Sequence, residues 1–566
     1  MSQAHYELFV RRRAGAQWTL EIATENRLQA IQAAEDALEQ GRAVAVRVSK
    51  ETHDAESGEY RSVAIFTKGD ADGGKSPKEP SDRAPLCVEP ADLYNVHARD
   101  RIGRLLEGWL TRHKATPFEL LHRPDLVEKL DASGNDLQHA LQKIAVPEAQ
   151  ARGQSVHEVI RHFQGLVERT IADLMRAFRK GVLPDLDKEG FSNAAKRLVD
   201  DPDRAFLLGA GVAASIAPAK SWSDKIVRLL DLAAAAPQEP TARAIALEAI
   251  ELPLAEIIGS KAGMADLLNA ADADLGDRLA MMIRLTGGVA VQTLIQHEAS
   301  VRACMPELPD AARRLSEWLT VGEFTTVRKA IATLVLTELN GVRRLKPADA
   351  EAEIEFLRAL AMSLMVAAGG VLQAEDIQIA FSTRSKSLLS GGFIDALLGH
   401  DRSAYDEIRM LIRLAENVIG ASSKRQAAKW IIANIGSRRL EDELRKGPGS
   451  PMAKLSQLAG LQRSLGRSGL AREDLEPLCA KLGEIGDQIE TETRFLTMVS
   501  RAPAPLGDRL SLLVKLAMGE TGPTGAVADK ARSEALKLIR DPSAQAQLAK
   551  SPQTLDLMKA LIQRAA

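Results

Sequence analysis

Aromatic residues are scarce in this chain of 566 residues, where phenylalanine, tryptophan and tyrosine together make up 4%. The apolar content is nevertheless an ordinary 45%, so the core must consist mainly of leucine, alanine, isoleucine and valine. Small aliphatic side chains allow helices to approach one another closely. The composition therefore favours a mainly helical protein with a sizeable core.

Cysteine is equally sparse. Cys87, Cys304 and Cys479 are odd in number and lie far apart in the sequence. This pattern excludes a disulfide framework and provides no pair with the spacing of a zinc site. The first residues, MSQAHYELFVRRR, lack the apolar core of a signal peptide. From these absences we expect a cytoplasmic protein.

Long apolar runs and an excess of one charge are missing too. The longest nearly unbroken apolar runs, 206–219 and 359–372, each have 14 residues, whereas a membrane-spanning helix needs about 20. We therefore expect two buried helices and no membrane insertion. The formal net charge is -2, so binding to nucleic acid would need a local basic patch.

Two different periodicities divide what is present. Apolar residues alternate with polar ones in four segments, 5–13, 17–23, 42–50 and 61–66, which is typical of strands. Between the second and third of these segments, apolar residues recur at the spacing of a helix. Asn26 and Gly41 are suited to begin and end that helix, and tight turns are expected at 14–16 and around Gly58. Residues 1–68 therefore predict a small α+β domain of order ββαββ.

After that domain, residues 69–90 are rich in glycine, proline, serine and aspartate and predict a flexible linker. From there to the C-terminus we find helical patterns only, the clearest being the apolar stripe of residues 155–181. The sequence predicts a large multi-helical body resembling a solenoid, divided into a first helical region at 91–320 and a second at 321–566.

The stretch RAFLLGAGVAAS (204–215) matches the dinucleotide fingerprint G-x-G-x-x-A through Gly209, Gly211 and Ala214. That fingerprint needs a preceding strand. Here Asp201, Pro202 and Asp203 form a helix start instead. We interpret the glycines as a helix packing contact and assign no cofactor.

Other motifs also fall short of a site. The two histidines of HEVIRH are five residues apart, roughly 140° around a helix, and cannot share one zinc ion. Six of the ten histidines lie between residues 97 and 162 at irregular intervals, which we interpret as polar helix faces: His97, His113, His122, His139, His157 and His162. STRSKSLLSGG (382–392) predicts a solvated loop between helices. No catalytic or metal-binding residue is assigned.

The best candidate for a partner-binding surface is segment 424–467. It contains ten lysines and arginines against three acids, a local charge of +7 in an almost neutral chain. A basic stripe beside an aromatic ring can bind phosphates. The alternative is a solvated helix face balanced by acids elsewhere in the fold. The candidate residues are Lys424, Arg425, Lys429, Trp430, Arg438 and Arg439.

Taken together, these patterns lead us to expect a non-enzymatic scaffold or regulatory adaptor that binds another protein through its helical body. Two alternatives stay open at this stage. One is a protein that binds nucleic acid or a phosphate ligand through 424–467. The other is an enzyme whose site lies between helices.

Overall fold

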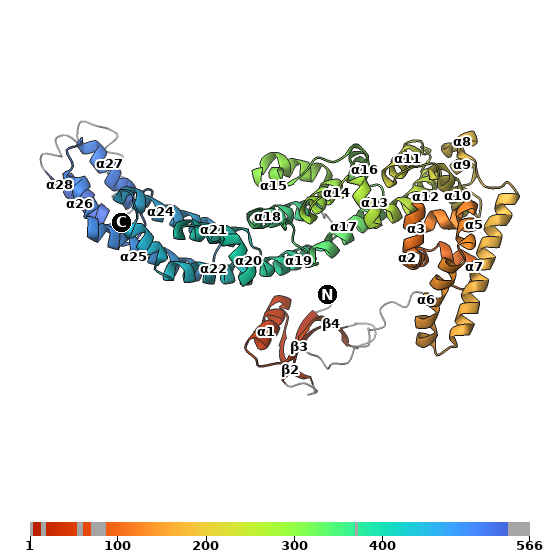
Figure 1. Cartoon of the computed structure of the whole chain (residues 1–566), viewed down its shortest axis with the longest axis horizontal. Helices are drawn as coiled ribbons and strands as arrows, with labels where there is room; N and C mark the ends of the chain where they lie inside the picture. Colours follow the sequence, from red (N-terminus) through yellow and green to blue (C-terminus); the bar gives the residue numbers. More distant parts are fainter. Residues whose placement is uncertain (1–3, 13–17, 54–59, 70–86, 368–371, 542–566) are drawn as a thin grey trace. The chain divides into compact units, whose positions relative to one another are not determined.

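The computed structural model describes residues 4–12, 18–53, 60–69, 87–367 and 372–541. These residues form 28 α-helices, one 3-10 helix and four strands (Figure 1). The chain divides into two compact units, Met1–Leu86 and Cys87–Ala566. The prediction of a mainly helical protein with a small N-terminal α+β part is confirmed. Most of the predicted linker lies outside the described residues.

The N-terminal unit is a four-stranded antiparallel sheet with one helix packed on it. Along the chain its elements are β1 (Ala4–Arg11), β2 (Thr19–Thr24), α1 (Arg27–Glu39), β3 (Ala45–His53) and β4 (Tyr60–Gly69), and the sheet order is β2-β1-β3-β4. The register places Leu8 opposite Val48 and Val10 opposite Val46. These four side chains are fully buried with three alanines of α1, which explains the alternation in the sequence.

Helix α1 begins and ends as predicted. The Asn26 side chain accepts hydrogen bonds from the backbone N–H groups of Leu28 and Gln29. Gly41 has a φ of +66° and its N–H donates to the Leu38 carbonyl just past the helix end. The predicted turns at 14–16 and around Gly58 lie outside the described residues.

The first helices of the second unit enclose an apolar core of their own. Trp109, Leu120, Leu126 and Leu174 belong to it. The long helix predicted over 155–181 is confirmed. The segments concerned are η1 (Pro90–Tyr94), α2 (Val96–Leu105), α3 (Glu107–His113), α4 (Pro117–His122), α5 (Pro124–Ala132), α6 (Asn135–Arg152) and α7 (Val156–Arg179).

The remaining described helices share one large apolar core. They are α8 (Leu186–Glu189), α9 (Phe191–Arg197), α10 (Arg204–Ile216), α11 (Trp222–Ala234), α12 (Pro240–Gly259), α13 (Lys261–Leu267), α14 (Leu275–His297), α15 (Ala299–Cys304), α16 (Asp310–Thr320), α17 (Thr325–Leu339), α18 (Ala350–Ala367), α19 (Ala374–Ser387), α20 (Gly391–Leu398), α21 (Ala404–Asn417), α22 (Ala421–Gly436), α23 (Arg439–Lys446), α24 (Pro451–Arg467), α25 (Arg472–Thr493), α26 (Phe495–Arg501), α27 (Leu506–Ala517) and α28 (Ala526–Arg540).

Many contacts join consecutive helices, such as α21 with α22, α24 with α25 and α27 with α28, and α14 packs on α18 across the three helices between them. Such neighbour-to-neighbour packing is typical of a helical array. Helix α17 also packs on α12 and α14, so helices from both sides of residue 320 are in contact. The division of the helical body at that residue stays a prediction.

Helix α14 is the one helix in the described part of the chain that is long and apolar enough to cross a membrane by length and composition. Half of its apolar window is buried inside the protein, and its backbone leaves the helical conformation at Gly288. Burial of this kind is that of a core helix and is compatible with a soluble protein.

The prediction of a solvated loop over 382–392 is wrong. Residues up to Ser387 belong to α19 and α20 begins at Gly391. The buried Arg384 guanidinium donates to backbone carbonyls in the last turn of α17 and just after it, including that of Leu339 at 2.7 Å. The Ser385 hydroxyl donates to the Phe381 carbonyl at 2.8 Å. Because backbone carbonyls accept the hydrogen bonds of these polar side chains, a segment rich in polar residues can still form a helix that is packed against its neighbours.

Candidate functional site

Two of the six predicted partner-binding residues are engaged inside the fold. The Lys424 ammonium donates to three backbone carbonyls, including that of Ser468 at 2.7 Å, and burial lowers the pKa of this lysine to about 8. The Trp430 indole N–H donates to the Leu389 carbonyl at 3.2 Å. Both side chains therefore hold α22 against its neighbours.

The other four side chains are exposed. Lys429 and Arg438 pair with no acid among the described residues, whereas the other two form ion pairs of 2.8 Å each, Arg425 with Glu473 and Arg439 with Glu407. Both acids lie outside segment 424–467, as does Glu492, which pairs with Arg445. Acids from neighbouring helices thus offset much of the local charge. That these residues bind a partner stays a prediction.

A buried polar cluster surrounds α4, a helix of six residues that begins with a capping box of Thr116 and Glu119 and with Pro117 in its first turn. The Glu119 carboxylate is fully buried and accepts from the Lys225 ammonium at 2.7 Å and from Arg123 at 3.1 Å. A second carboxylate, Glu256, accepts from the Phe118 backbone N–H and from Arg99, both at 2.7 Å. Two carboxylates thus satisfy backbone and cationic donors at the start of α4.

Burial acts on the ionisation of this cluster. It lowers the pKa of Lys225, against the attraction of Glu119, and it raises the pKa of Glu256, against the attraction of Arg99. Perturbed groups of this kind mark functional sites as well as structural ion pairs. Here each charge has a partner within 3.1 Å inside the protein, and the geometry is that of a structural network.

His122 corrects the interpretation that the histidines lie on polar helix faces. Its ring is buried and packs against Phe118, Tyr94 and Phe206, with a ring-centre distance of 4.3 Å to Phe118. The Nδ1 atom lies 2.7 Å from the Phe118 carbonyl oxygen, so Nδ1 carries the proton of the neutral ring. Burial lowers the pKa of His122 to about 4. His162 also departs from that interpretation, because its Nε2 lies 3.0 Å from the Cys87 carbonyl oxygen.

The GAG stretch lies in α10 and is a packing contact, as predicted. A Cβ at Gly209 would lie 2.7 Å from Nε2 of His122, and one at Gly211 would lie 3.1 Å from the Leu186 side chain. The same face of α10 lines an open cleft of about 450 Å³. The one basic side chain among the residues that line the cleft, Arg123, is held by Asp125 and Glu119, so no free cation there awaits a phosphate.

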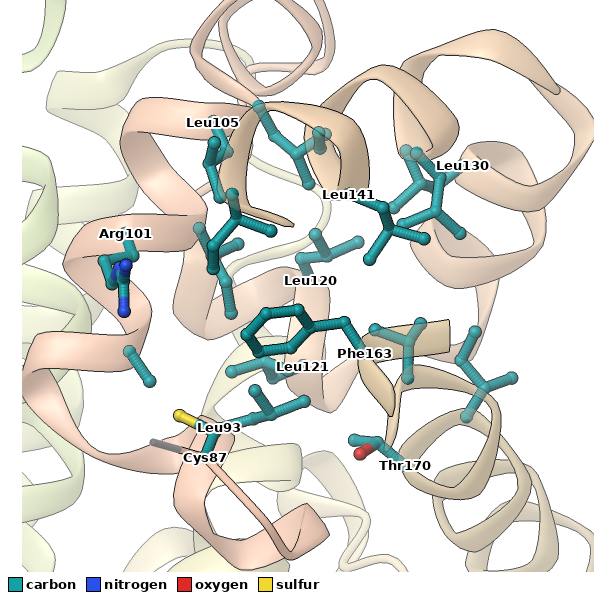
Figure 2. A pocket seen from close by; sticks show the side chains of 18 of the residues that line it. Cys87, Leu93, Arg101, Leu105, Leu120, Leu121, Leu130, Leu141, Phe163 and Thr170 are labelled. Carbon is teal, nitrogen blue, oxygen red and sulfur yellow. The ribbon is translucent and has the colours of Figure 1, made fainter. Parts of the chain in front are cut away.

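A second cavity, of about 130 Å³, lies between η1, α2 and α4–α7, is partly open to solvent and is lined almost wholly by aliphatic side chains (Figure 2). Arg101 and Cys87 lie on one side of it and Leu130 and Leu141 on the other. Arg101 pairs with Glu148 at 2.6 Å, and the Arg101 side chain keeps 27% of its surface exposed. Burial raises the pKa of the Cys87 thiol, so this group is uncharged.

Protein interiors are otherwise close-packed, so a partly open cavity of this volume offers room for a small apolar group. In the sequence the lining residues are indistinguishable from ordinary core positions. Their apolar spacing predicts burial but carries no signal of the space that remains between five helices.

Comparison of the chain with known protein families, with curated proteins and with solved structures gave no match. In the parts of the chain that the structure describes, no group of three or more histidine, cysteine, aspartate or glutamate side chains is arranged to hold a metal ion. The functional argument therefore rests on the geometry of the chain itself.

Proposed function

We propose that this chain is a cytoplasmic, non-enzymatic scaffold or regulatory adaptor whose helical unit binds another protein. The observation that carries the proposal is a set of exposed apolar side chains on three segments that meet where α14 breaks at Gly288. Clustered exposed apolar residues mark interaction surfaces. We call this group the α14 surface; it consists of Val289, Val321, Met365 and Val366, which expose 70%, 74%, 50% and 40% of their area.

Contacts of two glycines with neighbouring side chains bring together the segments that carry the α14 surface. Gly288 lies against Thr320, and Gly287 lies against Ala367. In the sequence, Val289 follows Gly288 and Val321 follows Thr320. Val366 precedes Ala367. Because Gly288 has a φ of +50°, a residue with a side chain would be strained there. The break in α14 therefore fixes where these apolar side chains emerge.

The cysteines support the intracellular part of the proposal. Cys87, Cys304 and Cys479 are free, and Cys87 and Cys304 are buried. Free thiols are typical of proteins in a reducing compartment.

The test is partner capture by the full chain from native lysate, compared between matched charge variants. Val289→Glu with Val321→Glu places two charges on the α14 surface, whereas Val342→Glu places one at a fully exposed valine elsewhere. We expect the double variant to lose the captured protein, and Val342→Glu to keep it, with melting temperatures unchanged in both. Capture that is equal for all three proteins would contradict the proposal, and light scattering would identify self-association.

A further inference from the structure

We propose that the apolar cavity between η1, α2 and α4–α7 is a binding site for a small anionic amphiphile. Its hydrocarbon part would fill the cavity, and its anionic end would bind Arg101. This site lies outside the α14 surface, and the inference does not depend on the partner-binding function proposed above.

The lining decides the chemistry of the buried part of the ligand. Aliphatic side chains from α2, α4, α5, α6 and α7, together with Phe163, provide most of the wall. The Thr170 hydroxyl already donates to the Leu166 carbonyl at 2.9 Å. A polar group placed in the cavity would lose its hydrogen bonds to water without replacement, so the buried part must be hydrocarbon.

Arg101 decides the chemistry of the other end. It is the one charged side chain among the lining residues, and it is partly exposed. A guanidinium has five N–H donors, and the contact with Glu148 uses Nη2 of Arg101. A carboxylate, sulfate or phosphate end can therefore bind the remaining donors or replace Glu148, whereas an ammonium end has no acceptor to offer the guanidinium.

The volume limits the length of the ligand. An engineered apolar cavity of about 150 Å³ holds one benzene molecule, so 130 Å³ provides room for on the order of six carbon atoms. Long acyl chains, such as those of membrane lipids, exceed this volume. The ligand is therefore a short amphiphile free in solution.

Binding of a graded series of probes to the full chain tests the proposal, with heat of binding and melting temperature as readouts. We expect hexanoate to bind and to raise the melting temperature, hexanol to bind more weakly and hexylammonium not to bind. Butanoate and hexadecanoate should both bind more weakly than hexanoate. Binding that is indifferent to head-group charge, or that strengthens steadily up to hexadecanoate, would overturn the proposal.

Variants locate the site. Ala140→Leu fills the cavity and should abolish hexanoate binding, whereas Ala214→Leu, in the cleft beside α10, adds the same side chain elsewhere and should leave binding unchanged. Glu148→Gln removes the competitor for Arg101 and should tighten hexanoate binding. Combining Arg101→Gln with Glu148→Gln should weaken hexanoate binding roughly tenfold relative to the wild type and leave the affinity for hexanol unchanged.

The two charge variants keep the test decisive even where Ala140→Leu does not fold, because they change a partly exposed charged pair and add no volume to the apolar wall. Weaker hexanoate binding by Glu148→Gln would overturn the assignment of the anionic end to Arg101. Unchanged hexanoate binding by the double variant would overturn it as well.

Discussion

Gly209 packs against the His122 ring so closely that a methyl group at this position would collide with it. The neighbouring His122 ring is fixed by its hydrogen bond to the Phe118 carbonyl and by aromatic rings around it, so it has little freedom to move. Gly209→Ala should therefore lower the free energy of unfolding by about 1–3 kcal/mol through overpacking. Denaturant unfolding measures this.

Gly165 is the matched control, because it lies inside α7 and has no atom within 4 Å of an added Cβ. Gly165→Ala should raise stability by about 0.4–1 kcal/mol, since alanine restricts the unfolded chain. If both alanine variants changed stability in the same direction, the contact between Gly209 and His122 would not be the cause.

His122 also makes stability depend on pH. Its pKa is about 4 in the folded protein, because burial disfavours the charged ring, and ordinary histidine titrates near 6.5. Between these values the unfolded chain binds more protons than the folded one, so stability falls as pH drops through this window. At pH 5 the loss from this residue should be about 2 kcal/mol relative to neutral pH. Urea unfolding of the wild type and of His122→Gln at pH 5 and 7 isolates this contribution, which the variant should lack.

At the scale of the element, α4 depends on a buried ion pair. Lys225 joins Glu119 on α4 to the Lys114 carbonyl just before it, and both charged side chains are almost completely buried. Lys225→Met would leave Glu119 with Arg123 as its remaining cation and should cost about 3 kcal/mol.

Adding Glu119→Gln to Lys225→Met should restore part of the lost stability, because glutamine still accepts from the Thr116 N–H without a buried charge. Unfolding free energies of the two single variants and the double variant form the required cycle. Additive losses would show that the two charges do not stabilise one another.

Sequence patterns succeed for elements that bury one face and fail for elements that bury every face. The strands around Leu8 and Val48 are predictable because alternate residues meet α1 and the others do not. Helix α4 has no polar face, since residues from Phe118 to His122 are all buried, so its short run shows no period. The burial of Arg384 was not predictable from local sequence either, because its hydrogen-bond partners are carbonyls 41 to 46 residues earlier in the chain.

The candidate sites follow the same rule. Lys424 is an exposed base by its sequence context, yet three carbonyls brought together by folding bury its ammonium. The cavity beside Arg101 arises from how five helices meet, and no local pattern encodes a gap between them. Residue types predict which positions are apolar, whereas tertiary packing decides which of them leave space.

At the scale of the whole molecule, the two units differ greatly in the apolar core that stabilises them. Among the described residues, eight form the buried core of the N-terminal unit and four of them are alanines, whereas the helical unit has one extensive core and a second smaller one. Small units bury a smaller fraction of their surface and are correspondingly marginal in stability. Heating should therefore unfold the N-terminal unit before the helical unit, and calorimetry should show two transitions.

Limited proteolysis assigns these transitions. The sequence predicts first cleavage within 69–90, and the resulting helical fragment should keep the upper transition at an unchanged temperature while the lower one disappears. The far-ultraviolet circular dichroism lost in the lower transition should be small, because the described part of the N-terminal unit contains one helix of 13 residues. A single transition that disappears entirely after cleavage would mean that the two units stabilise one another and do not fold separately.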